Sequence, residues 1–172
     1  MDFFDVVRER HSIRAYLPQA VEAEKLQAIL ETINRAPSAG NRQAFEVYVV
    51  TRAQQRQALA QACLSQGFVA QAPVDLVFCT HPALNEQRYG QRGATLYSPQ
   101  DAAIACTFAM LTATALGLST VWVGAFDDDA VYQVIGAPEG RRPVAVLPIG
   151  YAAETPRDRP RRPLDEIIHR LE

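Results

Sequence analysis

The sequence predicts a single α+β domain in which a central β-sheet is flanked by helices. Its length of 172 residues is typical of one domain, and its 48% hydrophobic residues are enough for a substantial core. Four runs of strand-forming residues alternate with segments whose apolar residues recur at helical spacing. Because no repeat or linker interrupts the chain, we expect one domain over residues 1–172.

The first half of the chain predicts three helices, a loop and one strand. Asp2 is a suitable N-cap for the first helix, and Thr51 with Gln54 three residues later forms a capping-box pattern for the third. The loop is rich in small and turn-forming residues. In chain order, the elements are a helix over 2–10, a helix over 22–35, the loop over 36–43, a strand over 45–50 and a helix over 51–64.

The second half predicts three strands and two helices, followed by an extended tail that ends in a short helix. Ser98, Pro99 and Asp101 form a helix-start pattern of cap, proline and acid, and Gly117 and Gly136 end helices. A polar segment follows the first of these strands. The elements are strands over 74–80, 119–123 and 144–150, the polar segment over 81–97, and helices over 98–116 and 127–135.

An apolar stretch over residues 102–118 covers most of the helix expected over 98–116, which is therefore apolar almost all round. Such a helix must be covered on every side, and a chain of this length offers few covers. We therefore expect a homodimer that buries part of this helix. The same stretch is punctuated by three threonines and a glycine and is short for a membrane span, so we expect no membrane partner.

Composition and cysteine usage exclude several classes of function. The net charge of −2 gives no general attraction to nucleic acid or anionic membrane. Sixteen of the 17 basic residues are arginine, which suits phosphate binding but also follows from a GC-rich genome. Cys63, Cys79 and Cys106 are widely spaced in apolar surroundings, which indicates reduced core residues. The start, MDFFDVVRER, lacks the features of a signal peptide, so we expect a cytoplasmic protein.

The sequence contains none of the usual catalytic sets of side chains. His11, His81 and His169 have no ligand-like spacing, so we expect no metal site, and there is no nucleophile elbow, P-loop or GxGxxG motif. The acidic run 127–129 favours capping of a helix over metal binding. An enzyme without acid, base and nucleophile sets can perform redox chemistry through a cofactor.

Two arginine clusters and one loop are the candidate binding elements. Arg10 and Arg14 flank His11 and Ser12, a grouping that suits a phosphate dianion. The second cluster is the proline-interleaved tail over 157–162, which lacks the aromatic residues that would stack nucleic-acid bases. Either cluster alone also fits a solvated surface. The loop over 37–43 offers amide groups that match the edge of a flavin ring, or is an ordinary helix-to-strand turn.

Taken together and in this order, these segments resemble the nitroreductase family of FMN-dependent oxidoreductases. RHSIRAY is similar to the family's RRSxRxF motif, and APSAGNRQAFEVYVV to its APSxxNxQPWxFxVV stretch. The segment from YSPQDAAIACTFAML to GLSTVWVGAF resembles the central helix and the GLGTxWIGxF motif. PIGYAAETPRDRPRRPLDEII resembles the closing GYPxExPxPRxRxPLxEIV. The resemblance implies a mixed central sheet in an α+β sandwich, an intertwined homodimer and FMN at the subunit interface.

The resemblance also implies roles for individual residues, with no catalytic side chain because flavin N5 carries the hydride. The first motif and the tail would bind the FMN phosphate and ribityl chain, the loop would reach the isoalloxazine from the partner subunit, and backbone groups after Trp122 would lie near N5. The implied cofactor-binding residues are Arg10, His11, Ser12, Arg14, Pro37, Ser38, Ala39, Asn41, Gln43, Val123, Gly124, Ala125, Arg159 and Arg161.

Three departures from the family pattern concern packing and substrate. Ala44-Phe45 replaces Pro-Trp, His11 replaces an arginine, and the chain lacks the long helical insertion that often covers the active site. The segment over 85–97 then becomes the expected substrate-side wall, with Arg88, Tyr89 and Arg92 as candidates.

The implied activity is ping-pong reduction of a nitroaromatic, quinone or similar small acceptor by NADH or NADPH through FMN. The alternatives are reductive dehalogenation, flavin fragmentation and a non-catalytic flavin carrier.

Overall fold

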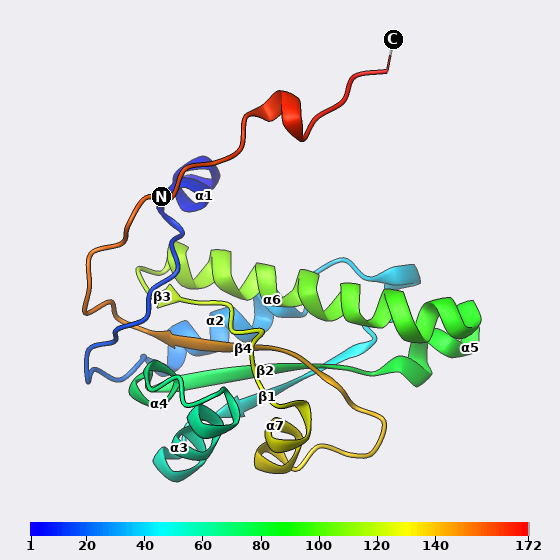
Figure 1. Cartoon of the computed structure of the whole chain (residues 1–172), viewed down its shortest axis with the longest axis horizontal. Coiled ribbons are helices and arrows are strands. Elements are labelled where there is room, and N and C mark those ends of the chain that lie inside the picture. Colours follow the sequence, from blue (N-terminus) through cyan, green and yellow to red (C-terminus); the bar gives the residue numbers. More distant parts are fainter. Residues whose placement is uncertain (172) are drawn as a thin grey trace.

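A four-stranded sheet forms the centre of the protein in a computed structural model that describes residues 1–171 (Figure 1). Its strand order is β1-β2-β4-β3, and each pair of neighbouring strands is antiparallel. The parallel component expected of a mixed sheet is an isolated bridge between Ser12 and Thr120. The strands are β1 (Phe45–Val50), β2 (Val74–Thr80), β3 (Ser119–Thr120) and β4 (Pro143–Gly150).

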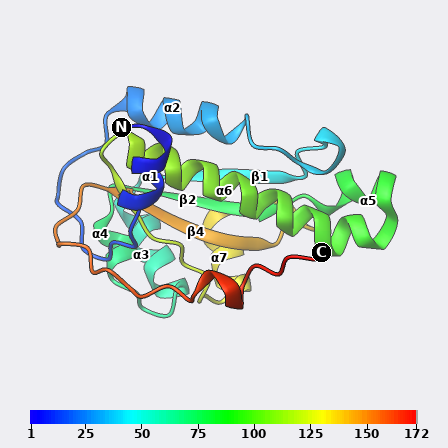
Figure 2. The same cartoon turned by 90° about the horizontal axis from the view of Figure 1, so that it is seen from above.

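Helices cover both faces of the sheet and produce three layers (Figures 1 and 2). The longest helix, α6, lies beside α2 on one face, while α3, α4 and α7 lie on the other. The helices are α1 (Phe3–Glu9), α2 (Ala23–Ile33), α3 (Ala53–Ala62), α4 (Phe68–Gln71), α5 (Pro82–Arg92), α6 (Ser98–Ala115) and α7 (Asp128–Ile135), with short helical turns at η1 (Ala39–Asn41), η2 (Gly93–Tyr97) and η3 (Leu164–Glu166).

Alternating side chains of the central strands fill two separate cores. On β2, Leu76 and Phe78 point into the core shared with α2 and α6, whereas Val77 and Cys79 point into the core shared with α3 and α7. All seven residues of β2 are buried, as expected for a strand covered on both faces. The runs over 45–50 and 74–80 were therefore correctly predicted as strands.

The outer side of α6 remains partly uncovered in the single chain. One side is buried against the sheet and α2, with Ala105, Ala109 and Ala113 fully inaccessible to solvent. On the other side Ile104, Phe108 and Leu111 are half-buried, and Thr107 is exposed. Residues 1–171 of a single chain therefore do not bury α6 on every side, as its apolar sequence led us to expect.

Two predicted helix caps are wrong. Helix α3 begins at Ala53 after Arg52, without a side-chain cap, so Thr51 forms no capping box. Helix α6 continues directly from the π-helical turn η2, and Ser98 therefore caps nothing. The Ser98 hydroxyl instead donates a hydrogen bond to the carbonyl of Ala44 and accepts one from the backbone N–H of His81 at 3.0 Å.

The polar segment over 81–97 is largely helical, which the sequence pattern did not predict. It forms α5 and η2, with a break at Gly90, whose φ is 56°. The terminal helix expected after the tail is only the short 3-10 turn η3, and Figure 1 shows this part of the chain running away from the sheet. Among residues 1–171, no helix is both long and apolar enough to cross a membrane.

Candidate functional site

The two arginine clusters of the sequence line one cavity, which we call the arginine pocket. It has a volume of about 510 Å³ and lies between the segment that follows α1 and the tail that follows β4. Residues some 147 positions apart in the chain therefore face each other, as His11 and Asp158 do. The side chains that line it include Arg8, Arg10, His11, Ser12, Arg14, Glu154, Arg157, Asp158, Arg159 and Arg161.

Backbone pairing at the edge of the sheet builds this pocket. The N–H of Ile13 donates to the carbonyl of Thr120 at 3.0 Å, and the N–H of Ala153 donates to the carbonyl of Ala15 at 2.8 Å. Ile13 is buried, whereas Ser12 and Arg14, its neighbours, are exposed. Because side chains alternate along an extended segment, this pairing directs the polar residues of the first motif away from the core and into the pocket.

Acidic groups order the basic side chains of the pocket. The ring of His11 contacts the Asp158 carboxylate through Nε2 at 3.0 Å and the Glu9 carbonyl through Nδ1 at 2.9 Å. The hydrogen bond to Asp158 raises the pKa of His11 above its ordinary value of 6.5, and the bond to Glu9 adds to this shift. The Glu154 carboxylate accepts a hydrogen bond from the backbone N–H of Arg14. These contacts join the segment after α1 to the tail at two points, and the arginines of both segments line the cavity between them.

The loop over residues 37–43, which we call the amide loop, has an unusual backbone that its own side chains hold in place. Asn41 and Gln43 have positive φ angles of 56° and 49°, and such conformations persist only where surrounding contacts enforce them. The Ser38 hydroxyl accepts from the Gln43 N–H at 2.9 Å, and the Gln43 side chain donates to Asn34 at 2.9 Å. The loop is thus more than an unconstrained turn.

The segment expected to form a substrate-side wall lies against the amide loop. Tyr89 and Tyr97 meet edge to face with ring centroids 5.2 Å apart, and Arg88 and Arg92 lie over these two rings. A Cβ atom added at Gly40 would clash with the Tyr89 hydroxyl, so the loop approaches this segment closely.

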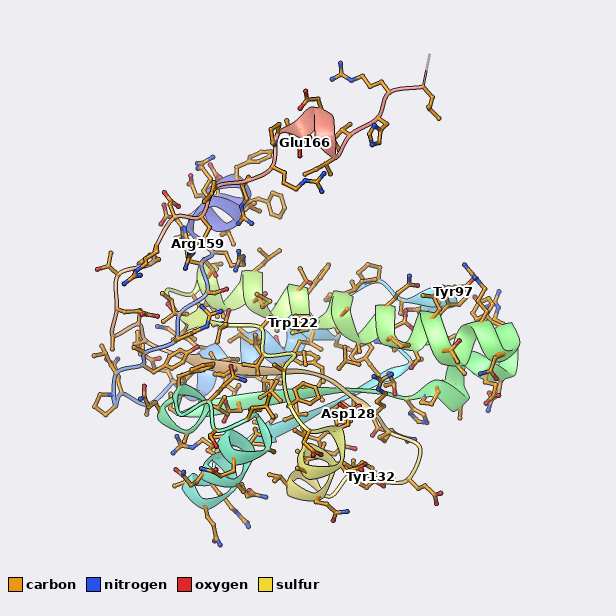
Figure 3. The ribbon with its side chains drawn as sticks, in the orientation of Figure 1. Tyr97, Trp122, Asp128, Tyr132, Arg159 and Glu166 are labelled. Carbon is orange, nitrogen blue, oxygen red and sulfur yellow. The ribbon has the colours of Figure 1, made fainter. Side chains whose placement is uncertain are left out.

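Helix α6 separates the two candidate regions. In Figure 3, Arg159 lies at the α1 end of the helix and Tyr97 at the opposite end. At the usual rise per residue, the 18 residues of α6 span about 27 Å. The amide loop and the arginine pocket of one chain therefore do not meet.

The segment that follows Trp122 runs beside β4 toward α7 (Figures 2 and 3). The backbone N–H and carbonyl of Val123 are both paired with Val146, at 2.9 and 3.0 Å. Gly124 and Ala125 are exposed. The Ala125 carbonyl accepts a hydrogen bond from the Gln66 side chain at 3.0 Å.

Comparison with known proteins identifies the family. The model of the Nitroreductase family matches residues 7–73 and 63–151, which include the first arginine cluster, the amide loop and α6. This chain belongs to the nitroreductase family. A Bacillus subtilis (strain 168) protein named as an FMN reductase with NAD(P)H is 29% identical to it, over 94% of this chain and 70% of that protein.

Solved structures agree with this family assignment. The structure of B. megaterium NfrA2 superposes with a TM-score of 0.90 at 27% identity, covering all of this nitroreductase-family chain and 75% of that one. A nitroreductase family protein of Clostridium difficile 630 superposes with a TM-score of 0.87 at 29% identity, covering 98% of both chains. The resemblance and the α+β fold class inferred from the sequence are confirmed.

Several residues beside the amide loop were not predicted as part of a site. A shallow hollow adjoins Ala39, and Asp101 at its floor contacts the loop. The local pattern predicted only a helix-start role for Asp101, and no local signal linked it to a residue 62 positions earlier. The residues that line this hollow are Ala39, Tyr97, Gln100, Asp101, Ala103 and Ile104.

The acidic run before α7 has the structural role that the sequence favoured. Asp127 caps the helix by accepting a hydrogen bond from the N–H of Ala130 at 2.9 Å, and Asp128 pairs with Arg142 at 3.1 Å. Within residues 1–171, no group of three or more His, Cys, Asp or Glu side chains is arranged to hold a metal ion.

Proposed function

We propose that this protein is an FMN-dependent oxidoreductase that uses NADH or NADPH to reduce a nitroaromatic, quinone or similar small acceptor. Its membership of the nitroreductase family and its likeness to a protein named as an FMN reductase support this proposal. The single observation that carries it is the arginine pocket, because two distant segments combine there into one group of basic side chains that suits a phosphate.

The groups of the pocket fit an FMN phosphate. Arg10, Arg14, Arg159 and Arg161 supply guanidiniums that can bind phosphate oxygens in pairs of parallel hydrogen bonds, and Ser12 adds a hydroxyl. His11 adds a positive charge at pH values below its raised pKa. The ribityl chain would lie beside His11.

The remaining half of each site would come from a second copy of the chain. The amide loop lies beyond reach of its own pocket, at the other end of α6, and the uncovered side of α6 offers an apolar surface for a partner. In the homodimer, the loops would line the isoalloxazine of the partner's site. The residues in this role are Pro37, Ser38, Ala39, Asn41 and Gln43.

The protein's residues bind and orient the reactants, while FMN, when bound, supplies the hydride chemistry through N5. Gly124 and Ala125 are exposed, and their backbone groups would lie at the ring edge. Reductant and acceptor would use the same open face in turn, with Arg88, Tyr89 and Arg92 as its wall. Three buried, unpaired cysteines suit a cytoplasmic location.

Flavin titration and a panel of acceptors test this function. We expect the purified protein to bind FMN with quenched flavin fluorescence and to oxidise NAD(P)H with nitroaromatics and quinones. Failure to bind FMN would contradict the proposal. Binding without NAD(P)H oxidation would indicate a flavin carrier. Turnover of only halogenated phenols would indicate a dehalogenase, and loss of the flavin itself during turnover would indicate fragmentation.

A further inference from the structure

Asp101 is a buried carboxylate that joins three elements at the amide loop. Its residue is 2% exposed. Oδ1 accepts a hydrogen bond from the backbone N–H of Ala39 at 2.8 Å, and Oδ2 accepts one from Nδ2 of Asn85 at 2.9 Å. The carboxylate on α6 is therefore bound to the amide loop on one side and to α5 on the other.

An ordinary helix-start role does not account for this residue. An acid in the first turn stabilises a helix by facing free N–H groups at its N-terminus. Here α6 continues from η2 without interruption, and Tyr97 and Ser98 both have helical backbone angles. The side chain of Asp101 instead faces Ala39, a residue distant in sequence.

We propose that Asp101 is a positioning residue that holds the amide loop in the conformation that receives the flavin ring, and that holds α5 beside it. This inference rests on the proposed function, in which the loop contacts the isoalloxazine. Asn41 and Gln43 have positive φ angles that surrounding contacts must hold in place, and the hydrogen bonds of Ser38 and Gln43 supply part of this support. The buried Asp101 carboxylate adds support from outside the loop, because its two oxygens accept hydrogen bonds from Ala39 and Asn85.

The side chain of Asn85 determines which substitutions of Asp101 can keep the hydrogen bonds at the amide loop. Asn85 is fully buried, and its Oδ1 has no hydrogen-bond partner among the described residues. In Asp101→Asn, the new amide can still accept from Ala39, and a flipped Asn85 can accept from the new NH₂ group. Asp101→Ala removes both bonds. The structure thus offers a conservative variant that keeps the geometry and a disruptive one that does not.

The test separates the ring site from the phosphate site by comparing FMN with riboflavin, which lacks the phosphate. We expect Asp101→Ala to weaken binding of both flavins by the same factor, about tenfold or more, since one bond to a charged group is lost at the loop. The visible circular dichroism of bound FMN should change, because it reports the surroundings of the ring. Asp101→Asn should restore most of the affinity and the spectrum.

Asp75 supplies the matched control. It is also a fully buried aspartate, but it lies on β2 and neither of its carboxylate oxygens has a hydrogen-bond partner among the described residues. Asp75→Ala and Asp75→Asn should leave both flavin affinities unchanged. If Asp101→Ala does not fold, the comparison of Asp101→Asn with Asp75→Asn still decides, with a small loss expected only for the former.

Two results would overturn the inference, provided that the wild-type protein binds FMN. The first is that Asp101→Ala binds riboflavin as tightly as the wild-type protein does and with the same spectrum. If the alanine variant does not fold, the same result in Asp101→Asn would count. The other is an equal loss in the corresponding Asp75 variant. A wild-type protein that fails to bind FMN would instead refute the proposed function.

Discussion

The arginine pocket and the amide loop differ in how their ligand-binding groups are held in position. The pocket is formed by exposed, charged side chains, and one of its walls is an extended tail whose residues from Glu154 to Pro163 are all exposed. The loop is fixed from below by the buried Asp101 and presents mainly backbone and amide groups. The difference indicates that the pocket provides affinity through charge, while the loop provides geometry.

The largest effect should follow from removing a guanidinium from the pocket. Arg14→Ala or Arg161→Ala should weaken FMN binding by about 1.5–3 kcal/mol for each lost charge-assisted contact, measured by fluorescence titration. Riboflavin binding should not change, because it uses no phosphate contact. Arg52→Ala, which removes an exposed arginine at the start of α3, is the control and should bind FMN normally. Unchanged FMN affinity in both pocket variants would place the phosphate elsewhere.

A smaller effect should follow from adding a methyl group in the amide loop. Gly40→Ala introduces a Cβ against the Tyr89 hydroxyl at a φ of 54°, so Tyr89 or the loop must move, and we expect a loss of about 1–2 kcal/mol in binding of both flavins. Gly140→Ala is the matched control, since Gly140 also has a positive φ but no heavy atom near the added Cβ. Equal flavin affinities in these two variants would mean that the loop does not contact the ring.

The smallest effect concerns stability, at the second buried aspartate. Burial raises the pKa of Asp75 well above its ordinary value of 3.8, and the positive charge of Arg56 only partly opposes the shift. A raised pKa in the folded protein means that stability is highest below the unfolded pKa and is lost as the pH rises toward the folded pKa. Asp75→Asn should remove this loss.

Urea unfolding of the apoprotein over a range of pH measures the Asp75 effect. Near neutral pH, Asp75→Asn should be more stable than wild type by about 1 kcal/mol, with a flatter pH dependence. Asp129→Asn, which alters an exposed aspartate, is the control and should keep the wild-type slope. A slope unchanged by Asp75→Asn would show that this carboxyl ionises normally in the folded protein.

Elements with a strong local pattern could be predicted from the sequence, and contacts between distant residues could not. The strands over 45–50 and 74–80 follow from runs rich in strand-forming residues, and Asp127 caps α7 as expected. The predicted cap at Ser98 failed because its hydroxyl is bonded to Ala44 and His81, and the one at Thr51 failed because α3 starts after Arg52, one residue later. The helix α5 was missed because it has few apolar residues to set a period.

The candidate site likewise contains residues that the sequence predicted and residues that only distant contacts reveal. Motifs in the sequence were enough to select the arginines that the structure brings together in one pocket. Nothing local indicated that Asp101 and Asn85 support the amide loop, since their partners lie 62 and 16 residues away.

Subunit complementation tests the central claim, that each flavin site combines the arginine pocket of one chain with the amide loop of its partner. A chain carrying Arg14→Ala and Arg161→Ala, and a second chain carrying Gly40→Ala and Asn41→Ala, would be co-expressed with different tags and purified as the heterodimer. Each homodimer should bind FMN weakly. The heterodimer should regain one site of wild-type affinity, because its two unaltered halves meet. A heterodimer with no such site would contradict the claim.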